Sequence, residues 1–167
     1  MLTEHLSLRR PRVADEEAYG DLFLRPELGE WLRPEPLPPF TIADSREMLR
    51  EDIRFWGDLG FGPWVLIERA GGSFVGRVGL RRTAIENESA VELVWTVDPD
   101  RQGRGSATEA ATAAIELARS VGLDEVVALT LPGNRASRRV AEKIGMRQSG
   151  EVQHAGLTHV LYRLALA

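Results

Sequence analysis

Residues Val91 to Leu117 read VELVWTVDPDRQGRGSATEAATAAIEL, and this stretch decides the fold. Its first seven residues are β-branched, apolar or aromatic apart from one glutamate, which predicts a buried strand from Val91 to Val97. Pro99 cannot donate a backbone hydrogen bond and restricts the residue before it, so the strand should end at Asp98. From Ala107 onward, small apolar residues recur at three- and four-residue spacing, a pattern typical of a helix that packs closely on a sheet.

A loop with two glycines and two arginines joins this strand to this helix. The first turn of a helix leaves backbone N–H groups without partners, and the helix dipole adds partial positive charge there. Gly103 and Gly105 allow the backbone to approach an anion closely, while Arg101 and Arg104 add positive charge. The loop therefore predicts a phosphate-binding site.

The spacing within the loop narrows the class of phosphate site. A P-loop would need a lysine followed by serine or threonine, and a dinucleotide fingerprint would need a third glycine where Thr108 stands. The pattern Gln102-x-x-Gly105-x-Ala107 instead resembles the pyrophosphate loop of the GNAT acetyltransferase superfamily. The extended run GRGSATEA, from Gly103 to Ala110, is similar to the RimJ/RimL-type branch.

A second motif supports the same resemblance. Residues Asn134 to Met146 read NRASRRVAEKIGM, which is similar to the N-x-x-S-x-x-x-x-E-K-x-G-F/M segment of RimJ/RimL-like acetyltransferases. The two motifs stand in the family's order, and the element order along the whole chain agrees with it. On these grounds the chain is identified as a member of the GNAT superfamily.

The resemblance implies direct transfer of an acetyl group from acetyl-CoA to an amine in a ternary complex, with acetyl-CoA as cosubstrate and no metal. It also implies which residues bind the coenzyme. The arm would run along Trp95, Thr96 and Val97, and the pyrophosphate would meet the loop formed by Gln102, Gly103, Arg104, Gly105, Ser106 and Ala107.

Two residues of the second motif have implied roles in catalysis or binding. Asn134 resembles the family asparagine that binds the coenzyme arm, although asparagine is also among the best N-caps for the helix that follows. Coenzyme contact is favoured because Ser137 follows at the family spacing. Ser137 resembles the hydroxyl that donates to the leaving thiolate. Many GNAT enzymes have a tyrosine acid where this chain has Ala141, so Ser137 or solvent is expected to take that role.

The base that removes the amine's proton is left open by the sequence. Glu92 is the first candidate, because an acid within an apolar strand is expected to be paired or used in chemistry. Its alternative is an ion pair with an arginine such as Arg77 or Arg82. His154, next to a predicted turn, is the second candidate, and a water chain is the third.

The remaining elements predict an α/β (α+β) fold in one domain, residues 1–167. A mixed, mostly antiparallel sheet of about six or seven strands should have helices on both faces and a central parallel pair. The proline-rich segment 25–40 is expected to be a partly ordered loop near the substrate. Helix 41–59 should be capped by Asp44 or Ser45. The expected strands are 6–10, 63–68, 73–82, 91–97, 125–131, 146–152 and 159–166, and the other helices are 15–24, 107–121 and 134–144.

Composition places limits on the functional class. The 167 residues are 43% hydrophobic and 28% charged, as in ordinary globular proteins. There is no cysteine, which excludes disulfides and thiolate nucleophiles, and the net charge of −4 argues against nucleic acid as a partner. No apolar run reaches the ~20 residues of a membrane span, and the start does not resemble a signal peptide, so a cytoplasmic location is expected.

The leading functional hypothesis is an N-acetyltransferase acting on a protein N-terminal α-amine or a small-molecule amine. The alternative is a non-catalytic domain that binds or senses acyl-CoA. Nucleotide binding is disfavoured by the missing P-loop lysine. Acceptor specificity is expected in residues 25–56 and 154–159, and a homodimer is compatible with the sequence.

Overall fold

The computed structural model describes residues 1–166, so Ala167, the last residue of the predicted domain, lies outside the described part of the chain. The stretch from Val91 to Leu117 folds as predicted. Strand β4 (Glu88–Val97) ends before Asp98, a short 3₁₀ turn η2 (Pro99–Arg101) follows, and helix α4 (Ser106–Ser120) begins one residue before the expected Ala107. Within α4, the side chains of Ala111, Ala114 and Ala118 are fully buried, which lets the helix approach the sheet closely. Val121, the last residue of the predicted helix, is exposed because the helix has ended and Gly122 turns the chain at φ 76°.

The described residues form one seven-stranded sheet in the order β1-β2-β3-β4-β5-β7-β6. All neighbouring strands are antiparallel except the central pair β4 and β5, which is parallel because α4 forms the crossover between them. This confirms the predicted fold class. The other strands are β1 (Leu6–Arg9), β2 (Pro63–Glu68), β3 (Phe74–Ile85), β5 (Glu125–Thr130), β6 (Arg147–His154) and β7 (Leu157–Ala165).

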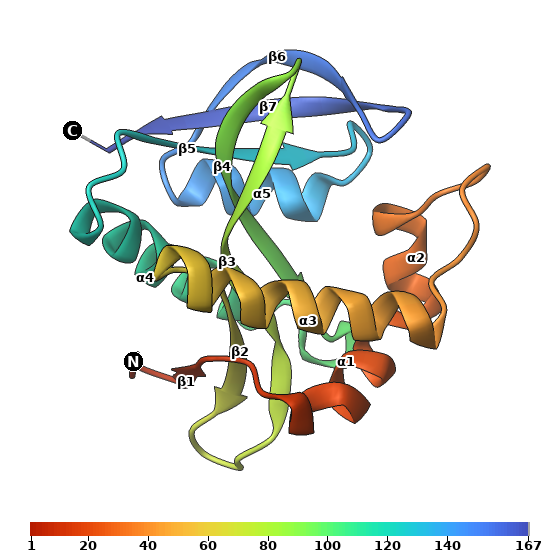
Figure 1. Ribbon diagram of the computed structural model, residues 1–167, viewed down its shortest axis with the longest axis vertical. Coiled ribbons are helices and arrows are strands. Elements are labelled where there is room, and N and C mark those ends of the chain that lie inside the picture. Colours follow the sequence, from red (N-terminus) through yellow and green to blue (C-terminus); the bar gives the residue numbers. More distant parts are fainter. Residues whose placement is uncertain (167) are drawn as a thin grey trace.

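Helices cover both faces of the sheet, as Figure 1 shows with α3 (Ile42–Leu59) in front of the sheet and α4 behind it. On the α3 face, a cluster of apolar side chains joins α1 (Glu16–Phe23) and α3 to β2 through Tyr19, Leu49 and Val65. On the other face, α4 and α5 (Arg135–Lys143) pack their alanines against β3, β4, β5 and β7. No helix within residues 1–166 is long and apolar enough to cross a membrane.

A buried ionic cluster ties the helices of the first face to the sheet. Asp52 of α3 accepts a hydrogen bond from the Tyr19 hydroxyl of α1 at 2.8 Å and is ion-paired with Arg77 of β3. Arg77 Nη2 lies 2.6 Å from the second Asp52 oxygen, and both side chains are almost completely buried. Burial lowers the pKa of the Arg77 guanidinium, but the Asp52 carboxylate more than offsets that effect, so the net pKa is raised and Arg77 stays charged.

Two local expectations were wrong. The segment 25–40 is not wholly a loop, because α2 (Pro26–Leu32) forms within it. Pro26 stands at the first helical position, where a missing N–H costs nothing. Helix α3 is capped by Thr41 rather than by Asp44 or Ser45. Asp44 stands three residues later and bonds back to the Thr41 backbone N–H at 2.8 Å, completing a reciprocal capping box.

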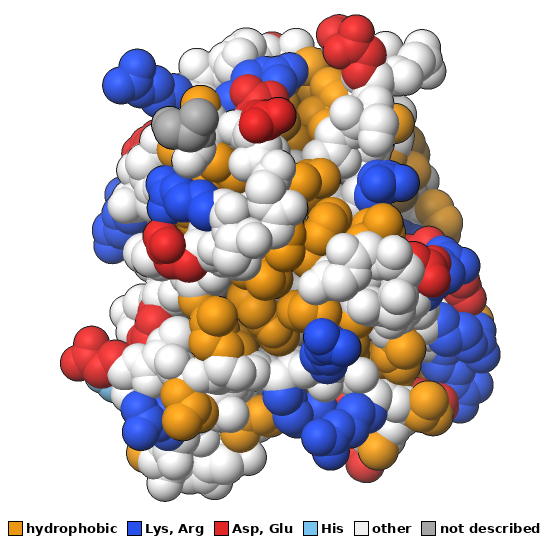
Figure 2. Space-filling model, turned by 60° about the vertical axis from the view of Figure 1, so that its left-hand side comes forward, with side chains coloured by type: hydrophobic (Ala, Val, Ile, Leu, Met, Phe, Trp, Pro, Cys, Tyr) orange, Lys and Arg blue, Asp and Glu red, His pale blue; other side chains and the backbone are white. Residues whose placement is uncertain are grey.

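Charged side chains of both signs surround a band of hydrophobic ones on the face shown in Figure 2. Because Lys and Arg side chains stand beside Asp and Glu side chains there, many charges are locally balanced. Ion pairs among the described residues include those of Arg119 with Glu116 and of Arg163 with Glu125.

Candidate active site

Strands β4 and β5 separate at the centre of the sheet. Their pairing within the described residues is limited to Glu92 opposite Val127. Beyond Glu92, β4 continues to pair with β3 as far as Val97, and β5 continues to pair with β7 as far as Thr130. The facing edges of β4 and β5 therefore have backbone groups that no strand of the described chain pairs, which is the arrangement an extended ligand can join.

The glycine-rich loop lies at the end of this gap. Gly103 and Gly105 have φ of 76° and 84°, a left-handed backbone conformation that residues with a Cβ rarely adopt. Gly105 is the N-cap of α4, and no side chain caps the helix there. The first amides of α4 are therefore available to an anion. Gln102 holds the loop to the strand end, since its Nε2 donates to the Val97 carbonyl at 3.0 Å.

A cleft of about 530 Å³ follows the gap and joins the two motifs. All residues of β4 from Glu92 to Val97 line the cleft, which follows the edge of the strand that β5 leaves unpaired. It brings together the predicted residues Glu92, Trp95, Thr96, Val97, Gln102, Gly103, Gly105, Ser106, Ala107, Asn134 and Ser137. Arg104 is the predicted residue that does not line it. Its side chain is exposed and extends toward Glu68, with nitrogen and oxygen 3.9 Å apart.

Ser137 and Trp95 meet across the gap. The indole Nε1 of Trp95 donates to Ser137 Oγ at 3.0 Å, so the serine oxygen already has a donor and its own O–H can point to another acceptor. Asn134 caps α5, because its Oδ1 accepts from the Ser137 backbone N–H at 3.0 Å. Asn134 is therefore the N-cap of α5, which was the alternative to coenzyme contact. Its amide nitrogen, which makes no hydrogen bond to the described residues, is the atom that remains for the cleft.

Ala141, where many GNAT enzymes have tyrosine, is completely buried in the core between α5 and the sheet. It lies outside the lining of the cleft, so this side of α5 presents Ser137 to it instead.

Glu92 is paired with Arg81, and not with Arg77 or Arg82 as expected from the sequence. In an antiparallel ladder, residues directly opposite share a face, and Arg81 stands opposite Glu92 in the register of β3 and β4. Both contacting nitrogens of Arg81 lie 2.8 Å from Glu92 Oε2. Oε1 receives no hydrogen bond from the described residues. Glu92 is the only acid among the described residues that line the cleft.

Two histidines line the same cleft beside Glu92. The rings of His154 and His159 pack edge to face with centroids 5.7 Å apart. Burial lowers the pKa of His159, and the neighbouring His154 acts in the same direction. The Leu157 carbonyl, 3.2 Å from His159 Nδ1, favours the tautomer with its proton on Nδ1. Sequence reasoning named His154 and missed His159, because only the β6–β7 hairpin, joined by Ala155 and Gly156, puts the two rings side by side.

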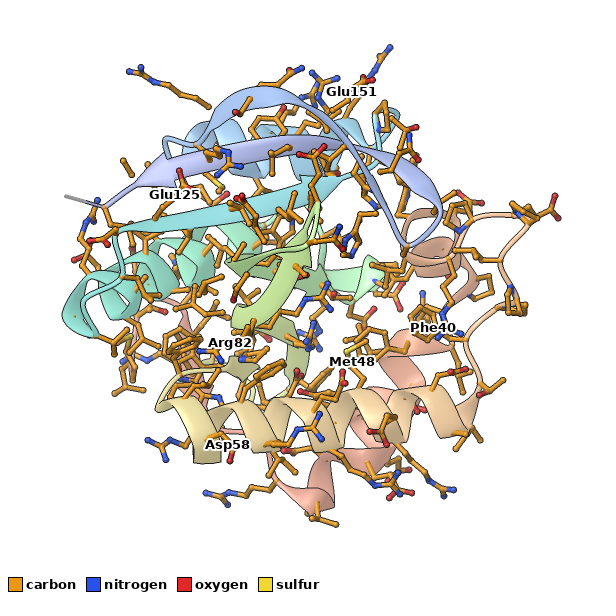
Figure 3. All side chains as sticks on the ribbon, turned by 45° about the horizontal axis from the view of Figure 1, so that its top comes forward. Phe40, Met48, Asp58, Arg82, Glu125 and Glu151 are labelled. Carbon is orange, nitrogen blue, oxygen red and sulfur yellow. The ribbon has the colours of Figure 1, made fainter. Side chains whose placement is uncertain are left out.

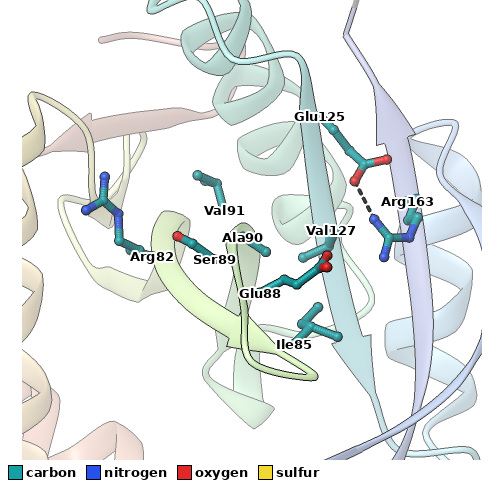
Figure 4. A pocket seen from close by; sticks show the side chains of 9 residues that line it. All are labelled: Arg82, Ile85, Glu88, Ser89, Ala90, Val91, Glu125, Val127 and Arg163. Atoms are coloured by element: carbon teal, nitrogen blue, oxygen red, sulfur yellow. Dashed lines mark hydrogen bonds and ion pairs between the residues drawn. The ribbon is translucent and has the colours of Figure 1, made fainter.

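A second, smaller hollow of about 300 Å³ lies between the β3–β4 hairpin and β5. Figure 4 shows its lining, including the ion pair in which Arg163 donates to Glu125 at 2.5 Å. None of the predicted site residues lines it, so the cleft between β4 and β5 is the candidate active site. Within residues 1–166 there is no group of three or more His, Asp or Glu side chains that could hold a metal ion.

Comparisons with known proteins agree with this geometry. Residues 5–147 match the family described as "Acetyltransferase (GNAT) domain". A stretch of 112 residues, 65% of this chain, is 34% identical to the uncharacterized protein YkkB of Bacillus subtilis. A shorter stretch of 64 residues is 39% identical to the uncharacterized N-acetyltransferase YnaD of the same organism. The matched parts span 64% and 38% of these relatives, less than two thirds of either.

Solved structures share the whole architecture. An acetyltransferase from Agrobacterium tumefaciens superposes with a TM-score of 0.84 at 27% identity, covering 98% of this chain and 92% of that one. The RimL ribosomal L7/L12 α-N-protein acetyltransferase, solved with coenzyme A, has the same fold with a TM-score of 0.78 at 20% identity, covering 99% and 96%. The chain belongs to the GNAT acetyltransferase family.

Proposed function

We propose that this protein is an acetyl-CoA-dependent N-acetyltransferase that transfers the acetyl group directly to a primary amine. The observation that carries the proposal is the single β4–β5 pair at Glu92, beyond which the two strands part toward an uncapped helix N-terminus. A coenzyme has an extended arm and a pyrophosphate. The unpaired strand edges can hydrogen-bond the arm, and the free amides in the first turn of α4 can bind the pyrophosphate.

The coenzyme arm would pair with the free edge of β4 at Trp95, Thr96 and Val97, as an added strand does. The pyrophosphate would accept hydrogen bonds from the amides between Gln102 and Ala107. Of the two arginines in the loop, Arg101 lines the cleft and Arg104 does not. Arg101 is paired with Glu68 at 2.8 Å, so the loop amides are the main donors to the pyrophosphate.

The sulfur end of the arm would lie near Ser137. Because Trp95 donates to Ser137 Oγ at 3.0 Å, the serine hydroxyl is oriented to donate in turn. In the reaction, the amine nitrogen forms a bond to the acetyl carbon, and the carbon–sulfur bond breaks. The Ser137 O–H stabilises the thiolate that leaves, in the way that a fixed donor stabilises developing negative charge.

The amine would enter from the Glu92 side of the cleft. Arg81 occupies Oε2 of Glu92, so Oε1 is the atom that receives an N–H of the acceptor and takes its proton as the bond to carbon forms. His159, neutral near pH 7 because its pKa is lowered, stands beside Glu92 as a further proton acceptor. Replacing Glu92 by glutamine should reduce kcat/KM for the amine on the order of 100-fold.

Ligand-induced stabilisation tests the coenzyme site first. A ligand at about 100 times its Kd stabilises the folded protein by about 2.7 kcal/mol, which raises Tm by ~5–10 °C for a chain of this size. We expect this rise with millimolar acetyl-CoA. The absence of any shift with acetyl-CoA or CoA would refute the proposal.

Turnover separates an enzyme from a domain that only binds or senses acyl-CoA. We expect CoA release with a panel of primary amines, since Ser137 and Glu92 both line the cleft. A clear thermal shift without CoA release from any amine would favour the binding domain instead.

A further inference from the structure

One wall of the cleft is built from apolar side chains that no coenzyme role requires. Seven of them come from α1, α2, α3 and the segment before α3: Phe23, Leu28, Trp31, Leu32, Leu37, Phe40 and Met48. Figure 3 shows Phe40 and Met48 on the inner side of α3, between that helix and the α2 segment, while Asp58 stands at the other end of the helix. Phe23 of this apolar wall lies beside Arg77, whose guanidinium carbon is 6.0 Å from the ring centroid. Arg77 stands on the same face of the sheet as Glu92, where the acceptor would enter.

The wall reaches across the cleft to the coenzyme side. A Cβ placed on Gly133, next to Asn134, would lie 3.7 Å from Trp31 Cζ3, which is ordinary van der Waals distance. Trp31 nevertheless remains 40% exposed, and Leu32 38% exposed. A large aromatic side chain that is in contact on one edge and open on another is suited to cover a ligand.

The cleft has too few carboxylates to bind a molecule with several positive charges. Glu92 is the only acid among the described residues that line it, and one of its oxygens is already occupied by Arg81. Five cations line it, of which Arg77 is paired with Asp52, Arg101 with Glu68 and Arg81 with Glu92. Asp44, in the first turn of α3, is paired with Arg33 at 3.0 Å. One carboxylate oxygen remains for one ammonium or amine group.

We propose that the acceptor is a monoamine with an apolar group within a few bonds of its nitrogen, and that acceptors with a second positive charge are rejected. The nitrogen binds at Glu92, and the apolar group is buried against Trp31, Phe40 and Met48. A second ammonium would have to leave water for an apolar wall, and no described carboxylate other than Glu92 lines the cleft to pair with it. This inference rests on the proposed function and narrows its substrate class.

Pentylamine and cadaverine (1,5-diaminopentane) form a matched pair of test acceptors. They share a primary amine and a five-carbon chain, and they differ at the far end, where one has a methyl group and the other a second ammonium. We expect kcat/KM with acetyl-CoA to be higher for pentylamine by on the order of tenfold or more. Equal or faster acetylation of cadaverine would overturn the inference.

The substitution Trp31→Glu tests the wall itself. Placing a carboxylate on the wall should lower kcat/KM for pentylamine, raise it for cadaverine, and so reduce the preference about tenfold or reverse it. Val13→Glu is the matched control, because Val13 is exposed and lies outside the cleft. An unchanged preference in Trp31→Glu, with a Tm like that of the control, would contradict the role of the wall.

The acetyl-CoA thermal shift, measured on the same samples, separates the two proposals. Acetyl-CoA binding with no transfer to pentylamine overturns the acceptor class and leaves the coenzyme site. Failure to bind acetyl-CoA refutes the proposed function itself.

Discussion

At the scale of single residues, the hydrogen bond from Trp95 to Ser137 leads to the most specific prediction about catalysis, which concerns the Ser137 hydroxyl. Replacing Ser137 by alanine removes the hydroxyl that would donate to the thiolate. We expect kcat to fall about 100-fold while the affinity for acetyl-CoA changes little. Ser120→Ala is the matched control, since its hydroxyl bonds only the Leu117 carbonyl at the far end of α4. Equal kcat values for Ser137→Ala and the control would assign thiolate protonation to solvent.

The lowered pKa of His159 predicts how the free energy of unfolding depends on pH. Its folded-state pKa is lowered from the ordinary value of 6.5 chiefly by burial, with His154 adding to the effect, while the Leu157 carbonyl and Glu92 oppose it. Just below pH 6.5 the unfolded chain therefore binds a proton that the folded chain does not. The free energy of unfolding should fall as pH drops from 6.5 toward the folded-state pKa. His159→Asn should flatten this part of the curve in urea titrations at several pH values. An unchanged slope would show that other groups cause it.

At the scale of elements, the junction between the loop and α4 depends on a left-handed glycine. Gly105 has φ 84°, and a Cβ added there would meet no atom within 4 Å, so a substitution is opposed by backbone conformation and not by crowding. Gly105→Val should lower the free energy of unfolding by ~1–2 kcal/mol and abolish the acetyl-CoA thermal shift.

Gly57, in the interior of α3, provides the matching control for Gly105. It also has open space around its Cα, but its φ is not positive. Gly57→Ala should therefore stabilise the protein by ~0.5–1 kcal/mol and keep the acetyl-CoA shift. If both variants behaved alike, the left-handed turn would not be what the coenzyme loop requires.

At the scale of the whole molecule, the buried cluster of Tyr19, Asp52 and Arg77 links α1 and α3 to strand β3. These two helices contribute to the apolar wall, and β3 pairs with the strand that contains Glu92. Asp52→Asn would leave the Arg77 guanidinium buried without its counter-charge. We expect a loss of about 3–5 kcal/mol in the free energy of unfolding, measured by urea denaturation. Glu47→Gln, which breaks an exposed pair with Arg50 on the same helix, should leave stability nearly unchanged. A small effect of Asp52→Asn would mean that water reaches this cluster.

Much of this protein was determined by local sequence. The strand Val91–Val97 and the small-residue face of α4 could be predicted because periodicity and backbone preferences act over a few residues. The two motifs also indicated residues at the coenzyme end of the cleft, such as Gly105, Asn134 and Ser137, since family resemblance is carried by short stretches.

Only the tertiary structure decided which side chains meet. Glu92 is paired with Arg81 because the β3–β4 register sets them opposite each other, whereas Arg77, four residues away, is taken by Asp52 of α3. His159 lines the cleft and Arg104 does not, and both facts depend on how distant elements pack together. The segment 25–40, expected to be a loop because of its prolines, contains helix α2, and Trp31 of that helix lies beside Gly133. Such contacts depend on register and on packing between distant elements, which no short stretch of sequence contains.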